Sequence, residues 1–210
     1  MNSETNRQQL ELEAAALIEL EARKKTFPLF FYKPAPKVAP FHVSRANLRI
    51  LAGGNRSGKT WYAVAEAFLY ALGRTTYAET PNPPVIIWYI MPSLPMFRRT
   101  ILPIVRKLAP RAEIKLTRNG DIITKKDNII TFKNGSEIHF LSADMGQKRL
   151  QGASVDVVFM DETPDEEVYK EAIARVRDRR GRLILVFAPI DATTYWVKAS
   201  LCLPWNSGER

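Results

Sequence analysis

The 210-residue chain is poor in the residues that build disulfides and zinc sites. It contains one cysteine, Cys202, so no disulfide can form within it, and this suits a reducing compartment. Its two histidines, His42 and His139, are not part of any Cys/His cluster, so the sequence indicates no metal site of that kind. No apolar run approaches the ~18 residues that a membrane-spanning helix needs. These scarcities argue against a disulfide-stabilised scaffold and a zinc-binding module, and they predict no membrane helix.

Acidic residues are also comparatively scarce. The chain has 31 Lys and Arg against 22 Asp and Glu, a formal net charge of +9. Basic proteins of this size often bind nucleic acid or an anionic surface, although such a charge can also serve solubility alone. The hydrophobic content of 46% and charged content of 25% are ordinary for a globular protein. A chain of this length can bury one core of its own.

The most specific motif in the sequence is a phosphate-binding loop. Residues 53–60 fit the P-loop pattern G-x-x-x-x-G-K-[ST], with a short apolar strand before them and a run of helix-forming residues after them. Such a loop offers backbone N–H groups and a helix N-terminus to phosphates. Lys59 is predicted to reach the β- and γ-phosphates, and the Thr60 hydroxyl to ligate Mg²⁺. The predicted nucleotide-binding residues are Gly53, Gly54, Asn55, Arg56, Ser57, Gly58, Lys59 and Thr60.

A second chemical site follows about a hundred residues later. The apolar run 155–160 predicts a buried strand, and it ends in Asp161-Glu162. Open α/β sheets keep their chemistry at the carboxyl ends of such strands. Asp161 is predicted to hold Mg²⁺ directly or through water, and Glu162 to orient and polarise the attacking water.

The remaining pattern predicts an α/β fold of the P-loop NTPase class (ASCE type), with a mostly parallel sheet flanked by helices. Apolar runs at 85–90 and 183–187 supply further buried strands. Ser93 and Thr163 are predicted to cap two helices that follow strands. Between these elements, Asn-Gly pairs favour an inserted antiparallel meander with strands at 114–117, 121–124, 128–132 and 137–141.

The first 45 residues form a lead-in, followed by an ATPase core at 46–200 and a tail at 201–210. Residues 2–25 predict a helix whose apolar stripe docks on the domain or on a partner. Residues 26–40 interleave aromatic residues with prolines, which predicts an extended segment before the P-loop strand, where a nucleotide base could rest. The apolar stripe of the helix predicted at residues 2–25 consists of Leu10, Leu12, Ala16, Leu17 and Leu20.

Four features together resemble the ATPase domain of tailed-bacteriophage terminase large subunits, over roughly residues 36–196. They are Phe41-His42-x-Ser44, the P-loop, Arg149-x-x-Gly152 and the strand ending in Asp161-Glu162. The resemblance implies a motor that uses ATP and Mg²⁺ to drive double-stranded DNA into a procapsid. It implies as partners double-stranded DNA, the portal protein, the small terminase subunit and further copies of the chain. Those copies form a ring, a pentamer in relatives, with a monomer as the alternative in isolation. It places the protein in the host cytoplasm, transiently docked on the portal, with no membrane.

The resemblance also implies an arginine that a neighbouring subunit supplies to trigger hydrolysis. Arg149 stands at the matching position, and Arg56 is the alternative. The candidate catalytic residues are therefore Glu162, Lys59, Arg149 and Arg56. Val38 stands at the position where relatives carry a glutamine that reads adenine. Ala188-Pro189 follows the strand after the acidic pair, where relatives often carry Thr-Pro or a similar polar pair.

Two further points follow from the family pattern. Relatives continue into a nuclease domain, for which 210 residues leave no room, so no nuclease activity is expected. The chain is then either an isolated ATPase half or the product of a split gene. Two other functions fit the motifs less well: a helicase-like nucleic-acid-dependent ATPase, and a nucleotide-binding scaffold with weak turnover.

Overall fold

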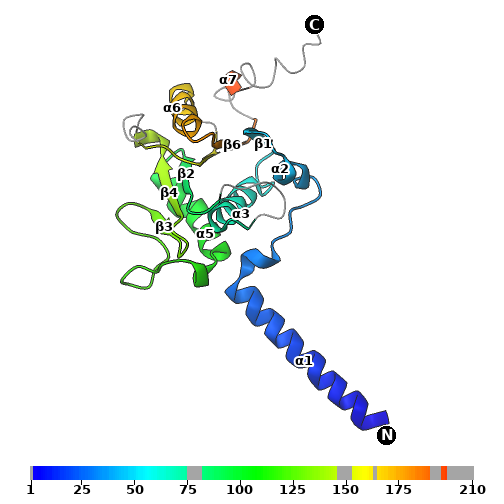
Figure 1. Ribbon diagram of the computed structural model, residues 1–210. Helices are drawn as coiled ribbons and strands as arrows, with labels where there is room; N and C mark the ends of the chain where they lie inside the picture. Colours follow the sequence, from blue (N-terminus) through cyan, green and yellow to red (C-terminus); the bar gives the residue numbers. More distant parts are fainter. Residues whose placement is uncertain (1, 75–81, 146–152, 163–164, 190–194, 198–210) are drawn as a thin grey trace.

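A six-stranded sheet organises the fold. The computed structural model describes residues 2–74, 82–145, 153–162, 165–189 and 195–197 (Figure 1). The strand order is β1-β6-β5-β2-β4-β3; all neighbours are parallel except β3, which is antiparallel to β4. One strand, β6, is inserted between the P-loop strand β1 and the strand β5 that carries the acidic pair, which confirms the predicted fold class. The strands are β1 (Leu48–Ala52), β2 (Ile86–Met91), β3 (Ile129–Thr131), β4 (Glu137–Ser142), β5 (Val157–Asp161) and β6 (Arg182–Phe187).

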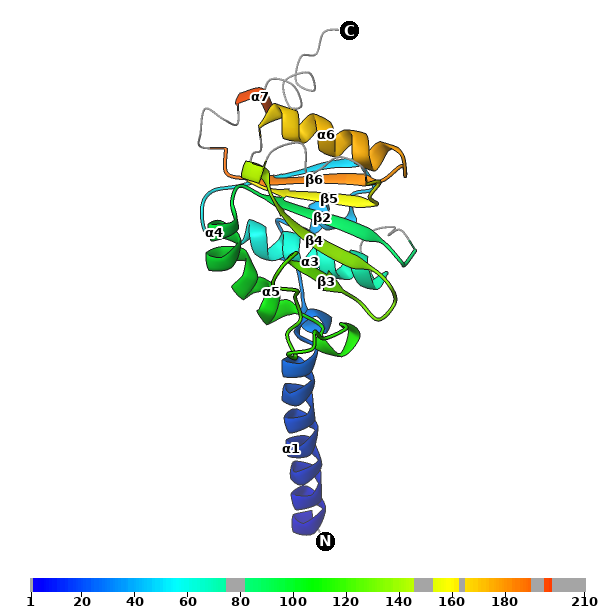
Figure 2. The same cartoon turned by 90° about the vertical axis from the view of Figure 1, so that its left-hand side faces the viewer.

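Helices cover both faces of the sheet. On one face lie α3 (Lys59–Leu72) and α5 (Leu102–Leu108), and on the other lie α6 (Glu166–Arg177) and α7 (Tyr195–Val197) (Figure 2). The central strand β2 is buried on both sides: Tyr89 packs toward α3, whereas Trp88 packs toward α6. This explains why its sequence is a continuous apolar run rather than an alternating one.

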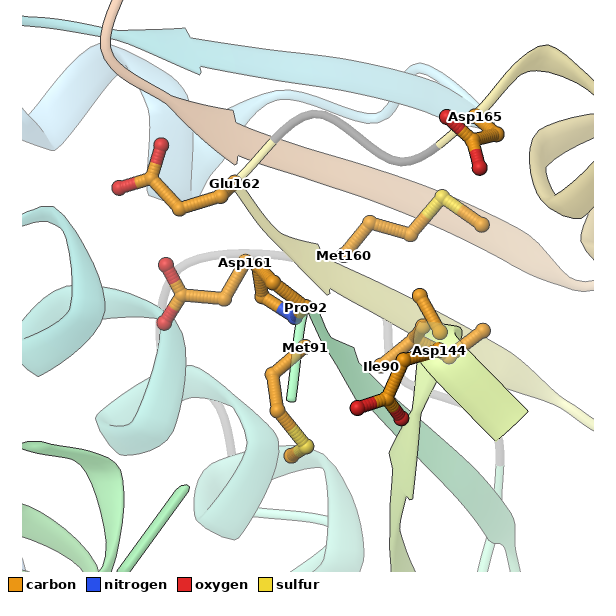
Figure 3. Close-up of a pocket in the computed structure, with 9 residues that line it drawn as sticks. Ile90, Met91, Pro92, Asp144, Met160, Asp161, Glu162 and Asp165 are labelled. Carbon is orange, nitrogen blue, oxygen red and sulfur yellow. The ribbon is translucent and has the colours of Figure 1, made fainter. Parts of the chain in front are cut away.

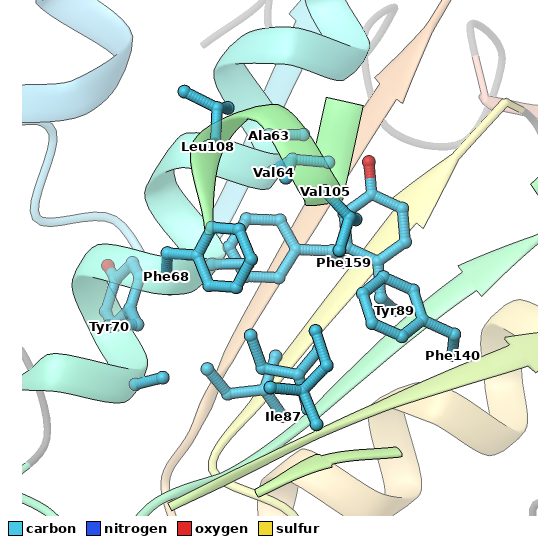
Figure 4. Packing of buried hydrophobic residues seen from close by; sticks show 14 of the residues in the cluster. Ala63, Val64, Phe68, Tyr70, Ile87, Tyr89, Val105, Leu108, Phe140 and Phe159 are labelled. Carbon is cyan, nitrogen blue, oxygen red and sulfur yellow. The ribbon is translucent and has the colours of Figure 1, made fainter. Parts of the chain in front are cut away.

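A dense aromatic core lies between α3 and the sheet (Figure 4). The rings of Tyr89 and Phe159 stack with centroids 5.8 Å apart, and both side chains are fully buried, as is Phe68 of α3. Burying a side chain of this size contributes about 1.5–3 kcal/mol. The carboxyl ends of β2 and β5 are therefore held rigidly against the P-loop helix.

The inserted meander is smaller than predicted. A β3–β4 hairpin forms around Asn134-Gly135, with β4 a member of the main sheet, but residues 114–117 are reduced to a single bridge from Ile114 to Phe132. Residues 121–124 form no strand. The N–H groups that a ladder would use bond locally instead: that of Asp121 donates to Thr117 Oγ1 at 3.1 Å, and that of Ile122 to Asp121 Oδ1 at 2.8 Å.

The N-terminal helix α1 (Asn2–Thr26) forms as predicted but projects away from the domain (Figures 1 and 2). Its large apolar side chains are exposed, with 72% of the Leu12 surface accessible, so the prediction that α1 docks on the domain is wrong. At 100° per residue, Leu10 and Leu12 point to opposite sides of the helix, so the leucines form no single stripe. Docking on a partner stays a prediction. In the part of the chain that the structure describes, no helix is long and apolar enough to cross a bilayer.

The proline-rich lead-in is more regular than the predicted extended segment. A 3₁₀ turn at Pro28–Phe31 and a short helix α2 (Ala39–Val43) each carry a proline at one of their first two positions. Proline is favoured there because it fixes φ and its missing N–H is not required. Between these two elements, residues 35–38 line a cavity together with residues of the P-loop.

Candidate functional site

The P-loop connects β1 to α3. Gly58 precedes α3 with φ of +86°, a left-handed conformation that glycine adopts without strain. A Cβ at this position would also lie 3.2 Å from the Tyr62 ring. The buried Lys59 side chain donates from Nζ to the Gly54 carbonyl oxygen at 2.8 Å. The loop therefore wraps around a lysine ammonium at the open end of a helix, an arrangement suited to anions.

The acidic pair meets the P-loop at the end of β5. The Thr60 hydroxyl donates to Asp161 Oδ1 at 3.2 Å, although the two residues are 101 positions apart in the sequence. Asp161 is only 1% exposed. The structure thus brings together the two chemical sites that the sequence indicates, with the P-loop hydroxyl and the strand carboxylate in direct contact.

A buried tyrosine holds the other oxygen of this carboxylate. Tyr89 of β2 donates its hydroxyl proton to Asp161 Oδ2 at 2.7 Å. Burial raises the pKa of Asp161 to about 6; hydrogen bonds from Tyr89 and Thr60 oppose this rise, and the charge of Glu162 adds to it. Burial, and then the Asp161 charge, raises the pKa of Tyr89 well above its ordinary value. Sequence reasoning missed Tyr89, which stands within an apolar strand; its hydroxyl in so apolar a run was the available signal.

Glu162 occupies a strained backbone position directly after β5. Its φ is +70°, a left-handed value that is uncommon for a non-glycine residue, and its N–H donates to the Val186 carbonyl oxygen at 2.7 Å. Strain of this kind gathers at functional sites. Figure 3 shows the carboxylates of Asp161 and Glu162 extending to the same side of the strand end. The N–H of Ala188, at the end of β6, lies 3.5 Å from Glu162 Oε2.

A small acidic cavity of about 200 Å³ borders the carboxylate pair (Figure 3). Two of its lining carboxylates, Asp144 and Asp165, were not predicted as site residues. Asp165 is the residue that precedes α6, so this helix begins at Glu166, later than the Thr163 cap predicts; residues 163–164 lie outside the described part. The lining residues are Ile90, Met91, Pro92, Ala143, Asp144, Met160, Asp161, Glu162 and Asp165.

A larger cavity of about 730 Å³ lies against the P-loop. The proline-rich segment 35–38 forms one wall and the P-loop the other, so the lead-in does lie beside the loop. Its volume falls in the range of small-molecule sites, about 300–1,000 Å³. The lining residues are Ala35, Pro36, Lys37, Val38, Leu51, Ala52, Gly53, Gly54, Ser57, Lys59 and Tyr62.

The oxygen donors at the centre of the site fit magnesium. Mg²⁺ takes oxygen ligands and is usually held by one or two carboxylates together with substrate phosphates and water. Thr60 and Asp161 supply a hydroxyl and a carboxylate in contact. Among the described residues no three His, Cys, Asp or Glu side chains cluster as a self-sufficient metal site. Only one of the two predicted arginines falls within the described residues. Arg56 is an exposed loop residue with φ of +62°, whereas Arg149 lies outside the described residues.

Comparison with known proteins decides the family. A family model described as "Terminase large subunit, T4likevirus-type, N-terminal" matches residues 50–198. The chain belongs to this terminase family. No curated protein matches it.

Solved terminase structures share the fold. The large terminase of a thermophilic bacteriophage superposes with a TM-score of 0.54 at 19% identity, covering 81% of this chain and 39% of that one. The same terminase in complex with ADP gives 0.53 at 23% identity, with 82% and 39% covered. Its complex with ATP-gamma-S gives 0.52 at 21% identity, with 82% and 38% covered. The chain therefore spans about two fifths of the length of these terminases.

Proposed function

We propose that this chain is the ATP-hydrolysing motor domain of a viral terminase large subunit, which drives double-stranded DNA into a procapsid. The observation that carries the proposal is the contact of Thr60 with Asp161, which joins a P-loop to an acidic strand end in a member of the terminase family. The ADP and ATP-gamma-S complexes of the thermophilic bacteriophage terminase support nucleotide as the ligand of this fold.

In the proposed mechanism the P-loop binds the triphosphate. The Lys59 ammonium exchanges its bond with the Gly54 carbonyl for the β- and γ-phosphates, while the N-terminus of α3 faces the same anions. Thr60 and Asp161 would hold Mg²⁺, which neutralises phosphate charge when bound. Tyr89 keeps the Asp161 carboxylate oriented by donating a 2.7 Å hydrogen bond to its Oδ2.

Glu162 is the proposed general base. It extends from the same strand end as Asp161 and to the same side (Figure 3), and its backbone φ is +70°. A carboxylate in this position orients a water molecule for in-line attack on the γ-phosphorus and accepts its proton. Hydrolysis then gives ADP and inorganic phosphate, with the new P–O bond formed as the bond to the β-phosphate oxygen breaks.

The assembly around this site is proposed from the family. Residues 46–200 form the motor core, and copies of the chain form a ring on the portal in the host cytoplasm, with the small subunit and DNA as partners. A guanidinium from a neighbouring copy, Arg149 with Arg56 as the alternative, would stabilise charge in the transition state. The net charge of +9 is consistent with contacts to DNA phosphates.

The test is phosphate release from ATP by the purified chain, with and without double-stranded DNA. Lys59→Ala should reduce turnover at least a hundredfold, and Glu162→Ala should do the same while ATP binding persists. Lys133→Ala, which removes an exposed lysine far from the loop, is the matched control and should turn over normally. Wild-type turnover by Lys59→Ala would refute the P-loop assignment, and loss of ATP binding by Glu162→Ala would make Glu162 a structural residue.

A further inference from the structure

The cavity beside the P-loop has the position and size of a nucleoside pocket. It is lined by Ser57 and Lys59 of the loop and by residues 35–38. On the function proposed above, a nucleotide with its phosphates on the loop extends its sugar and base along this cavity. The chemistry of the 35–38 wall then decides which bases the site accepts.

The backbone of this wall is partly occupied by its own hydrogen bonds. The Ala35 carbonyl accepts from the N–H groups of Val38 at 2.8 Å and Ala39 at 3.0 Å. The Val38 carbonyl accepts from the N–H groups at 41 and 42, at 3.0 and 3.3 Å. Pro36 has no N–H to offer. The carbonyl groups of Pro36 and Lys37 and the N–H group of Lys37 have no hydrogen-bond partner among the described residues. This backbone therefore offers both acceptors and a donor, and it does not by itself select one base over the other.

The side chains of the cavity do not select adenine over guanine either. Adenine presents a donor at position 6 and guanine an acceptor, while both present N7 as an acceptor. Among the described lining residues no side chain is a carboxylate or a carboxamide, the groups that would accept from the adenine amine. The hydroxyls of Ser57 and Tyr62 rotate to donate or accept. The exposed Lys37 is a donor only, and therefore matches guanine O6 better than the adenine amine.

Tyr62 supplies a fixed aromatic surface that any base can use. Its ring makes edge contacts with Tyr32 and His42, with centroids 6.4 and 6.3 Å away, and it lies against the backbone of Gly58. Stacking on such a ring is tolerant of base identity, because every base has a π-face.

We propose that this chain uses guanine nucleotides as well as adenine nucleotides, with the base held by apolar contact and by Tyr62. GTP and water would give GDP and inorganic phosphate by the same attack on the γ-phosphorus. A site built to hydrogen-bond one substrate group rejects an analogue that lacks it by about 10⁴–10⁵-fold, whereas an apolar pocket discriminates far less, by about 10–200-fold. Affinities for ATP and GTP within about fivefold of each other are expected.

Competition binding tests the inference directly. ATP bearing a fluorescent methylanthraniloyl group on its ribose is bound to the wild-type chain and displaced with unlabelled ATP or GTP, and phosphate release is measured with each. Displacement constants within about fivefold, with turnover of both nucleotides, are the expected result. Binding and turnover of ATP alone, with GTP more than about thirtyfold weaker, would overturn the inference and leave the proposed function standing. Binding of neither nucleotide would overturn both.

Variants separate the sources of selectivity. Lys37→Met keeps the apolar stem but removes the donor, so GTP should weaken several-fold while ATP is unchanged; Lys33→Met, exposed and outside the cavity lining, is the control. Val38→Gln adds a carboxamide that can pair with adenine and should raise the ATP preference about tenfold. Tyr62→Ala should weaken both nucleotides alike, by about tenfold, and Tyr62→Phe should retain the affinity. A loss confined to ATP in Tyr62→Ala would contradict a base-tolerant contact.

Discussion

The ionised carboxylate of Asp161 destabilises the nucleotide-free fold, and Asp161→Asn is predicted to relieve this. The side chain is 1% exposed, and burial raises its pKa from near 3.8 to about 6. Between these two pH values the folded chain binds more protons at this position than the unfolded chain does. Its stability therefore falls as the pH rises through this window, and the full cost is present above it.

The size of the effect follows from the pKa difference. At 1.36 kcal/mol for each tenfold change in proton affinity, ionised Asp161 costs about 3 kcal/mol at pH 8 and about half of that at pH 5. An asparagine has nearly the same shape, and the Thr60 hydroxyl can accept from its amide while Tyr89 still donates to its oxygen. Asp161→Asn should therefore stabilise the chain by about 2–3 kcal/mol at pH 8, which is roughly 4–12 °C in Tm for a domain of this size.

The assay is urea unfolding of wild type and Asp161→Asn at pH 5 and pH 8, without nucleotide or divalent cations. The expected gain at pH 8 is about twice the gain at pH 5, and it accompanies a loss of nucleotide hydrolysis. Asp127→Asn, an exposed carboxylate in a loop, is the matched control and should shift stability by less than about 0.5 kcal/mol at either pH. If Asp161→Asn is no more stable than wild type at pH 8, or its gain is independent of pH, the reasoning fails.

Three further substitutions test other parts of the account. Tyr89→Phe leaves a buried carboxylate oxygen without its donor, so urea unfolding at pH 8 should show a loss of about 1–3 kcal/mol, and an unchanged midpoint would mean that the hydrogen bond is unimportant. Gly181→Ala would place a Cβ atom 2.3 Å from the carbonyl oxygen of Asp156, the residue before β5, so a stability loss of about 1–3 kcal/mol is expected. Wild-type stability of this variant would contradict the packing. Arg149→Ala subunits should regain ATP turnover when mixed with Glu162→Ala subunits under conditions where wild type forms rings. Mixtures as inactive as either variant alone would argue against an arginine that acts between subunits.

Local sequence was sufficient to predict the geometry of the P-loop. The loop, the turn at Gly58 and the helix from Lys59 are consecutive, so their pattern carries their geometry. The acidic pair was found for a related reason: Asp161 ends an apolar run, and the carboxyl end of a buried strand is a defined place in an open α/β sheet. That both sites share a sheet edge followed from the fold class, and the order of the strands confirms that class.

The parts that sequence could not provide depend on contacts between distant elements. Tyr89 reaches Asp161 because β2 pairs with β5; its hydroxyl within an apolar run signals a buried hydrogen bond but does not indicate the partner. The segment 121–124 has strand-like composition, but its turn is stabilised by side chain–backbone bonds such as that to Thr117 Oγ1. The apolar stripe predicted in α1 does not dock on the domain, because its leucines are exposed and do not share one helix face.

The central claim is that a P-loop hydroxyl and a strand carboxylate 101 residues away serve one magnesium-nucleotide site. A double-mutant cycle in ATP affinity, measured with and without Mg²⁺ for wild type, Thr60→Val, Asp161→Asn and the double variant, tests it most directly. The account predicts that Mg²⁺ tightens binding to wild type, that each single variant loses most of this gain, and that the double variant loses little more. Losses whose free energies simply add, or a wild type indifferent to Mg²⁺, would contradict it.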